Sequence, residues 1–280
     1  MLKSLSFWSI PEKDGKPVRP VDAMHIVKDA GYDALELAVG LSGYLTPDTS
    51  HADCSRFQTE AARIGVQLQS IASGMTWECS PTHLDADVRA RAIDLNKRAL
   101  DRVAWIGAQS YLFVPGAVTI PWDANYKQVP YDQAVKWAHE AVEILGEYAA
   151  NLGVELCVEN VWNGMFYSPL ELRDFLDSFQ NPSIGSYFDA GNLLGLHQCP
   201  AHWIALLGKR IRRVHIKDYK TSVGGLAGFV NLLEGDMPWK ETMDALRAIG
   251  YDKTITAEIL PPTGDTVAVT SVALDKIFAL

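Results

Sequence analysis

The sequence predicts a single-domain (β/α)8 barrel, a TIM barrel, over residues 1–280. Three observations lead to this prediction. A short phrase ending in glycine recurs along the chain, each recurrence precedes a short apolar run, and eight such strand–helix units fit the length. Barrels of this kind routinely run to roughly 250 residues as one domain. No linker or low-complexity tract divides the sequence.

The recurring phrase ends in glycine at positions 31, 65, 107, 153 and 250. The segments before these glycines have helical periodicity. In Tyr131 to Leu152, the clearest case, the apolar positions near one face are Ala134, Val135, Ala138, Val142, Leu145 and Ala149. Many helices end in a left-handed residue, which glycine adopts without strain. We therefore expect each glycine to end a helix and to precede a strand.

Eight strands are expected in chain order, at residues 2–7, 34–39, 66–71, 111–114, 154–158, 184–188, 213–217 and 254–259. These runs are short and apolar, as buried parallel strands are. Helices are expected between them, including 200–207, and the last begins at about Thr266. Eight units favour a closed barrel over an open doubly wound sheet. The dinucleotide-binding alternative is weakened because no GxGxxG opens the first helix.

Composition narrows the class of protein. The chain is 48% apolar and 21% charged, with a net charge of −9, which is typical of a soluble protein and argues against nucleic acid as the main partner. No apolar stretch is long enough to span a membrane, and the N-terminus does not resemble a signal peptide. The four cysteines lack metal-binding spacing, and Cys157 is expected to be buried. We expect a cytoplasmic protein.

An acid or imidazole stands near the end of each of the last four strands: Glu159, Asp189, His215 and Glu258. Barrel active sites lie at the C-terminal strand ends, and neighbouring strands are about 4.8 Å apart, so these side chains can converge. Three clustered carboxylates would raise one another's pKa unless a cation lay among them. We therefore predict one divalent metal ion. The ligand types suit Mn²⁺, Mg²⁺, Co²⁺ or Zn²⁺ and do not choose among them, and Mn²⁺ is the ion we expect.

The alternative is that each of the four is a separate polar group satisfied at its own strand end. Buried acids are rare unless they are paired or coordinated, which argues against this reading for the whole set.

Around these residues the chain resembles the xylose-isomerase-like TIM-barrel superfamily of sugar-phosphate isomerases and epimerases. The motifs extend along nearly the whole chain: Leu35-Glu-Leu, Val158-Glu-Asn, Phe188-Asp-Ala-Gly-Asn, His215-Ile-Lys-Asp218, Glu234-Gly-Asp236, Gly250-Tyr251 and Thr256-Ala-Glu258. The resemblance implies that the four strand-end residues bind the metal. It also implies that Glu159 and Glu258 are the acid/base pair of a ketose or ketose-phosphate 3-epimerase, which moves the C3 proton through a cis-enediolate.

Two positions depart from the free-ketose 3-epimerases. Asn192 stands where they typically have histidine, and Lys217, Asp218 and Lys220 stand where they have arginine. The His-Ile-Lys-Asp version looks closer to pentulose-5-phosphate 3-epimerases and to inosose dehydratase relatives. The glycine-rich loop 222–228 and its flanking lysines suit a phosphate, and they equally suit a flexible lid. The expected partner is a small-molecule sugar or sugar phosphate.

Five further residues are predicted to contact the substrate: Trp8, Glu36, Asn160, Asn192 and Lys217. Lys217 shares the strand parity of His215 and should point the same way. Glu36 ends the second strand and is equally suited to a salt bridge with a rim Lys or Arg. The two asparagines also suit ordinary turn chemistry, and Trp8 also suits packing of the rim.

Other reactions start from the same proton removal next to a carbonyl: dehydration of an inosose, aldose–ketose isomerisation, and elimination from a 3-keto-glycoside. A remote alternative is an apurinic-endonuclease-like DNA repair enzyme. That class needs about three zinc ions and several histidines from the third, fourth and sixth strands. No histidine occurs at the ends of those strands in this sequence, which are residues 70–73, residues 114–116 and Asn192. A non-catalytic barrel would have no use for clustered acids. Barrels of this type often form homo-oligomers, and the apolar residues 277–280 suit either a subunit contact or packing against their own barrel.

Overall fold

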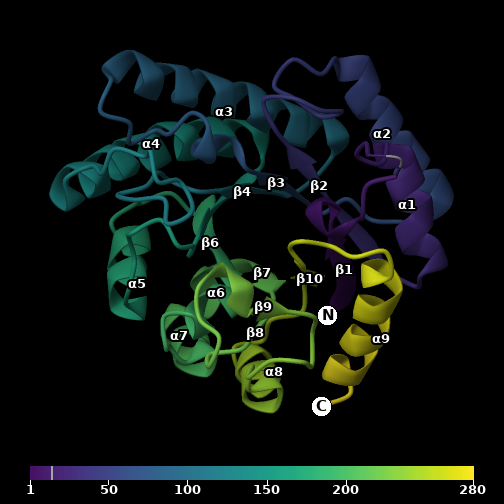
Figure 1. Ribbon diagram of the computed structural model, residues 1–280. Coiled ribbons are helices and arrows are strands. Elements are labelled where there is room, and N and C mark those ends of the chain that lie inside the picture. The colour runs from purple at the N-terminus through teal and green to yellow at the C-terminus, as the bar shows by residue number, and fades with distance from the viewer. Residues whose placement is uncertain (14) are drawn as a thin grey trace.

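A computed structural model describes residues 1–13 and 15–280. Eight parallel strands form a closed barrel in the order β1-β10-β7-β6-β5-β4-β3-β2, and helices surround it (Figure 1). The strands are β1 Leu2–Ser6, β2 Ala34–Val39, β3 Ser70–Ser73, β4 Ser110–Phe113, β5 Glu155–Glu159, β6 Ile184–Asp189, β7 Ile211–Ile216 and β10 Thr254–Ala257. The predicted (β/α)8 barrel is confirmed.

The helices alternate with these strands. They are α1 Pro20–Asp29, α2 His51–Ile64, α3 Ala86–Ile106, α4 Tyr131–Leu152, α5 Pro169–Asp177, α6 Gly191–Leu194, α7 Pro200–Leu207, α8 Trp239–Ala248 and α9 Thr266–Phe278. A short hairpin of β8 (Asp218–Tyr219) and β9 (Phe229–Val230) follows β7 at the mouth. The expected bounds of α4 and α7, and the expected start of α9, are confirmed.

The third strand differs most from its expected position. The sequence predicts residues 66–71, whereas β3 covers Ser70–Ser73. Before β3, Gln67 makes one isolated bridge to Ala34, while Val66 and Leu68 pack into the hydrophobic core. The apolar pattern therefore marks the approach to the strand as well as the strand itself.

The recurring glycines end helices as expected. Gly65, Gly107 and Gly153 follow α2, α3 and α4 with φ of 79°, 80° and 70°, in the left-handed region. Gly31 and Gly250, which follow α1 and α8, also have positive φ. Each of these positions turns the chain from a helix toward the next strand, so the spacing of the glycines sets the spacing of the barrel units.

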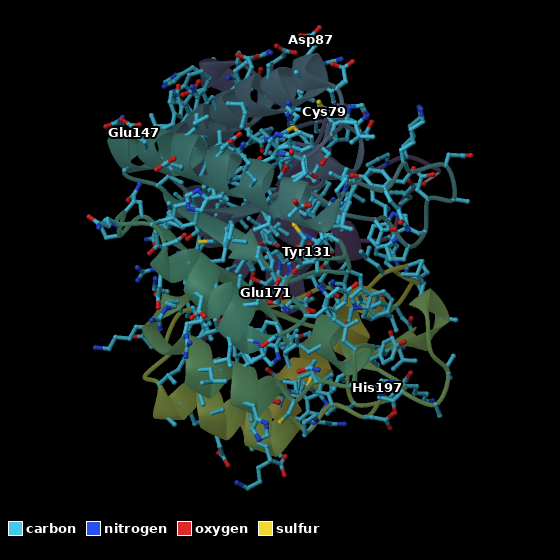
Figure 2. The ribbon with its side chains drawn as sticks, turned by 90° about the vertical axis from the view of Figure 1, so that its left-hand side faces the viewer. Cys79, Asp87, Tyr131, Glu147, Glu171 and His197 are labelled. Atoms are coloured by element: carbon cyan, nitrogen blue, oxygen red, sulfur yellow. The ribbon has the colours of Figure 1, made fainter. Side chains whose placement is uncertain are left out.

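The two faces of the strands differ in polarity. Residues such as Leu35, Leu156 and Val214 face the helices and belong to the large apolar core. Inside the barrel, Glu36 of β2 accepts hydrogen bonds from Ser70 of β3 and from β7. Figure 2 shows Asp87 and Glu147 on the outer surface of α3 and α4. The larger apolar core thus lies between the strands and the helices, and the barrel interior holds polar side chains beside a smaller apolar cluster.

Among residues 1–13 and 15–280, no helix is long and apolar enough to cross a membrane. All four cysteines are free. Cys157 is fully buried, as expected, and burial raises the pKa of its thiol to about 12, which keeps it protonated and unreactive.

Gly153→Ala should lower the free energy of unfolding by about 1 kcal/mol, because an L side chain is strained at this left-handed position. An added Cβ would meet no atom within 4 Å, so backbone strain is the only expected effect. Gly264→Ala is the matched control, since it also has open space but no positive φ. Urea denaturation of both variants tests this, and equal midpoints would contradict it.

Candidate metal and active site

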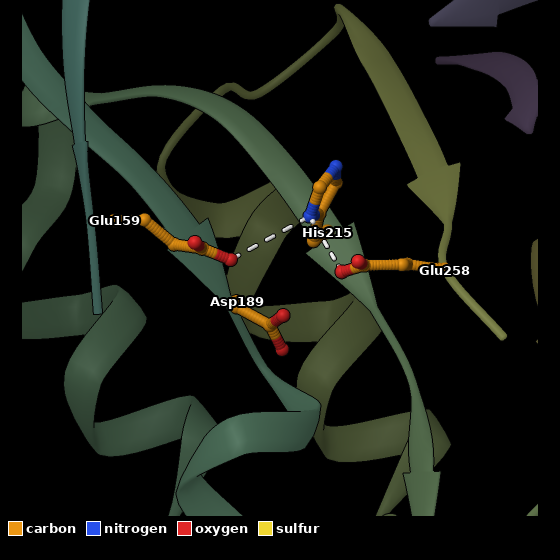
Figure 3. Close-up of side chains that lie close together, drawn as sticks. All are labelled: Glu159, Asp189, His215 and Glu258. Atoms are coloured by element: carbon orange, nitrogen blue, oxygen red, sulfur yellow. Dashed lines mark ion pairs between the residues drawn. The ribbon is translucent and has the colours of Figure 1, made fainter. Parts of the chain in front are cut away.

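Four buried side chains converge at the C-terminal end of the barrel (Figure 3). Glu159 and Asp189 are the last residues of β5 and β6, His215 lies in β7, and Glu258 directly follows β10. Each offers one ligand atom, and these atoms all lie within 4.8 Å of one another. Neighbouring parallel strands thus bring together residues that are far apart in the sequence, at the point expected from their strand positions.

His215 is oriented by a carboxylate on the far side of the barrel. Its Nε2 donates to Glu36 Oε1 over 2.6 Å. The other oxygen of Glu36 accepts from Ser70 Oγ at 2.7 Å and from the hydroxyl of Tyr187. Because Nε2 is engaged in this way, Nδ1 faces the cluster, and it has no hydrogen-bond partner among the described residues. It lies 3.2 Å from Glu258 Oε2 and 3.7 Å from a Glu159 oxygen.

Glu36 therefore has a different setting from the one expected. It lies within β2, three residues before the strand ends, and only 1% of its surface is exposed. Both carboxylate oxygens are bonded to side chains of the barrel interior, including Tyr187, which the sequence analysis did not single out. A carboxylate that fixes the tautomer of a histidine is a common support for metal ligands. The structure gives Glu36 this supporting position.

Lys217 extends into the same cluster. Its Nζ lies 2.9 Å from Asp189 Oδ2 and 2.7 Å from Glu258 Oε2, and it donates to Asn192 Oδ1 over 3.3 Å. Burial opposes its charge, but the surrounding carboxylates raise the pKa of Lys217 above its usual range. The side chain is 13% exposed and points the same way as His215, as strand parity predicts.

The two glutamates of the cluster have different surroundings. Burial raises the pKa of Glu159 to about 7, although the neighbouring imidazole of His215 and the charge of Lys217 act in the opposite direction. Burial acts the same way on Glu258, but Lys217 and His215 outweigh it and lower the pKa of that carboxyl to about 2. For His215 burial acts in the other direction and would lower the pKa of the imidazole. Glu36, Glu159 and Glu258 outweigh burial and raise that pKa well above its ordinary value.

Asn160 and Asn192 fix the position of Asp189. Asn160 Oδ1 accepts from the Asp189 amide at 3.0 Å, and its Nδ2 donates to the Asp189 carbonyl at 2.7 Å. The amide of Asn192 donates to Asp189 Oδ1 at 3.0 Å, and its Nδ2 donates to the Asn160 carbonyl. Both side chains are buried and bonded within the protein, so the two residues join the ends of β5 and β6.

The loop after β7 is held by Asp218. This fully buried carboxylate accepts the backbone N–H groups of Tyr219, Leu233, Gly235 and Met237 at 2.8–3.1 Å. A side chain at position 235 would collide with the Asp218 carboxylate, so glycine is required there. These contacts explain why the motif contains Asp218 and Gly235, because both residues hold the loop in its conformation. Within it, the Tyr219 hydroxyl donates to the Gly225 carbonyl, which folds the glycine-rich segment against the hairpin.

Trp8, which is predicted to contact the substrate, and three other tryptophans lie in separate places around the mouth. Trp8 and Trp77 pack on the interior cluster that includes Ala72, Leu112 and Cys157. Trp77 also meets Trp122 edge to face, with ring centroids 4.9 Å apart. Trp162 instead packs with the hairpin, against Tyr219 and Phe229. His197, which lies beyond α6 and near the rim, is exposed at the surface (Figure 2).

These residues fit a divalent metal ion. Three carboxylates and one imidazole nitrogen form the donor set, and His215 Nδ1 is buried, directed at the cluster and unpartnered. Such a set of oxygen and imidazole donors suits Mn²⁺ and its neighbours among the divalent ions. All four ligands must be deprotonated to bind, so metal loading is expected to weaken as the pH falls.

Glu36→Gln should weaken Mn²⁺ binding by roughly 10- to 100-fold, because the amide no longer fixes His215 with Nδ1 toward the metal. Ser70→Ala is the control: it removes one hydrogen bond to Glu36 but keeps the contact between Glu36 and His215. It should cause a much smaller loss. Titration calorimetry with Mn²⁺, beside circular dichroism to verify folding, measures both effects. Unchanged affinity in folded Glu36→Gln would show that Glu36 does not support the metal.

Several known proteins resemble this chain in sequence or in structure. D-psicose 3-epimerase from Agrobacterium fabrum is 25% identical over 247 residues, which covers 86% of this chain and 79% of that protein. The structure of D-psicose 3-epimerase from Clostridium cellulolyticum H10 superposes with a TM-score of 0.80 and 18% identity, covering 100% of this chain and 99% of that one. The 3-keto-D-glucoside 4-epimerase of E. coli gives a TM-score of 0.77 at 13% identity, with both chains covered completely.

At these identities the structural likenesses show a shared fold, which agrees with the closed barrel described above. The sequence family is shown separately, because the model of the xylose isomerase-like TIM barrel family matches residues 24–274. The chain belongs to the xylose isomerase-like TIM barrel family, as its motifs indicated.

Proposed function

We propose that this protein is a metal-dependent sugar or sugar-phosphate epimerase that transfers the C3 proton of a ketose. The observation that supports this most directly is the placement of two carboxylates on either side of His215. Glu159 approaches from β5 and Glu258 from the end of β10, and their side chains point toward each other (Figure 3). A substrate carbon lying between them would present one face to each carboxylate.

Epimerisation at C3 requires that a proton leave one face of the carbon and return to the other. In our proposal one glutamate removes the proton and the other supplies a proton from the opposite side, so that the configuration inverts. A divalent ion, for which we propose Mn²⁺, would be held by Glu159, Asp189, His215 and Glu258 and would stabilise the negative charge of the cis-enediolate as a Lewis acid. The barrel interior around these residues is buried, which strengthens each electrostatic interaction.

Lys217 is proposed to contact the substrate beside the metal. Its ammonium already lies among the carboxylates, and a substrate oxygen that gains negative charge could take their place as its partner. We assign Glu36, Asn160 and Asn192 to positioning rather than to direct contact, because their polar atoms are bonded within the protein.

A second candidate reaction uses the same site on a 3-keto-glycoside, by epimerisation or elimination next to the ketone. The observation that favours it is an apolar cavity beside the mouth, and one barrel of the same fold is a 3-keto-D-glucoside 4-epimerase. Dehydration of an inosose also begins with loss of a proton next to a carbonyl and would use the same residues.

Lys217→Met should bind Mn²⁺ more tightly, by roughly tenfold or more, because a cation that competes for the same carboxylates is removed. The turnover rate should fall by about 100-fold, because a charge that stabilises the enediolate is lost. Lys220→Met, at an exposed position three residues along, is the control for both measurements. Weaker metal binding in Lys217→Met would mean that the lysine supports the site structurally.

The proposed reaction predicts exchange of the C3 proton in D₂O, followed by NMR over a panel of pentuloses, hexuloses and their phosphates. Exchange should yield the C3 epimer and should stop when a chelator removes the metal. The substrate that responds also decides whether the sugar is phosphorylated. If protein with one metal per chain exchanges no ketose proton, the 3-epimerase proposal fails, and inososes and 3-keto-glycosides become the substrates to test.

In the same assay, Glu159→Gln and Glu258→Gln separate the two faces of the reaction. Each should lower epimerisation by roughly 10²- to 10⁴-fold. In each variant the remaining glutamate should still exchange the proton of one epimer without inverting it. Glu155→Gln is the control, because Glu155 lies on the same strand but at the opposite end of the barrel. Metal content is measured for every variant, so that loss of the ion is not mistaken for loss of the base.

A further inference from the structure

A cavity of about 730 Å³ opens beside the candidate active site. Its walls come from the segments that follow β1, β2, β3 and β10, which form the half of the barrel mouth next to the metal-binding half. The side chains of Phe7, Trp8 and Leu41 are partly exposed, and Tyr44 is 45% exposed. Cavities of about 300–1,000 Å³ bury ligands larger than a single sugar.

The cavity adjoins the segment after β10, where Pro262 belongs to its lining. Ser9 lies in the segment between the lining residues Trp8 and Ile10, and its hydroxyl accepts the backbone N–H of Ile259 at 2.7 Å. Ile259 directly follows Glu258. Trp8, which lines the cavity, also packs on the interior cluster that includes Tyr187, and the Tyr187 ring lies 4.5 Å from that of His215, so the cavity adjoins the candidate metal site.

The walls of this cavity suit an uncharged aromatic group better than they suit sugar hydroxyls or a phosphate. Apolar and aromatic side chains predominate, whereas a free ketose bears an oxygen on every carbon. The charged residues among the described lining are Glu12 and Glu78, both acidic, and no Lys, Arg or His belongs to that lining. An uncharged aromatic group suits these walls, and hydroxyls on it could donate to the two carboxylates.

We infer that the substrate is a glycoside whose aromatic aglycone occupies this cavity while its sugar ring lies at the metal-binding residues. This inference rests on the second candidate reaction proposed above, in which Glu159 and Glu258 transfer a proton next to the ketone of a 3-keto-glycoside. In a glycoside the anomeric carbon is blocked, so the carbonyl must lie on another ring carbon. A dehydrogenase reaction must therefore supply the substrate, passing two electrons and two protons from a ring CH–OH group to an oxidant such as a nicotinamide or flavin cofactor.

Binding is tested with phenyl and methyl β-D-glucosides, which have no ketone and cannot react. Saturation-transfer NMR and tryptophan fluorescence measure their affinities for the Mn²⁺-loaded protein. The phenyl glucoside should bind about tenfold or more tightly than the methyl glucoside, because its ring removes apolar surface from water. Equal affinities would overturn the inference.

Two variants locate the bound ring. Tyr44→Ala removes one wall of the cavity, and Leu41→Trp fills part of it, so each should abolish most of the preference for phenyl while leaving methyl glucoside binding unchanged. Tyr167→Ala is the matched control, because Tyr167 is 51% exposed on the loop after β5 and does not line this cavity. A preference that survives both cavity variants would mean that the ring binds elsewhere.

Activity separates this inference from the proposed function. With the 3-keto derivatives of the two glucosides, exchange of the ring protons next to the ketone should show a kcat/KM about tenfold higher for phenyl, and Tyr44→Ala should remove the difference. Preferential binding of phenyl without any proton exchange would refute the proposed function and leave the aromatic subsite intact. Exchange with free ketoses and no phenyl preference would refute the subsite and leave the proposed function intact.

Discussion

Mutual repulsion of buried carboxylates is the constraint around which this barrel is organised. The side chains of Glu36, Glu159, Asp189 and Glu258 meet inside one mouth, each with 5% of its surface or less exposed. Burying an unpaired carboxylate costs several kcal/mol even after relaxation, so such a set is stable only with positive charge among its members. His215 contacts three of the four, and Lys217 contacts two. The backbone N–H of Asn192 bonds Asp189 Oδ1, and the hydroxyls of Ser70 and Tyr187 bond the second oxygen of Glu36.

The two cations of the cluster differ in how firmly they are held. Glu36 fixes the His215 ring across the barrel, and Tyr187 packs against that ring edge to face at 4.5 Å. Lys217 reaches the carboxylates along a flexible unbranched chain, so its ammonium can withdraw without any movement of the backbone. His215 is thus already oriented with Nδ1 toward the place where a divalent ion would bind. The ion would replace the Lys217 ammonium beside Asp189 and Glu258. The displaced ammonium would stay at the edge of the site, where a substrate oxygen can meet it.

Periodic features of the sequence predicted the fold, because helix-ending glycines and apolar runs are local properties. The same logic placed Glu159, Asp189, His215 and Glu258 together, since strand ends in a parallel barrel share one rim. What could not be predicted depends on contacts across the barrel. Glu36 and His215 are 179 residues apart in sequence, and their contact requires that both face inward at matching heights.

The third strand lies further along the chain than predicted, because Val66 and Leu68 are apolar for packing against the core rather than for pairing in the sheet. The cavity was missed because it is built from loops, whose shape follows no periodic pattern.

The mouth of the barrel therefore has two chemically different halves. The strands β5, β6, β7 and β10 supply the acids and cations, whereas the segments after β1, β2 and β3 supply apolar and aromatic walls. The closed sheet forces these halves to adjoin, because β10 pairs with both β7 and β1. The hydroxyls of a sugar ring can form hydrogen bonds with the charged half, but the apolar half has few partners for them. The aromatic glycoside that we infer would match both halves, with its sugar ring at the charged half and its aglycone at the apolar half, and the pairing of β10 with β1 places the two halves side by side.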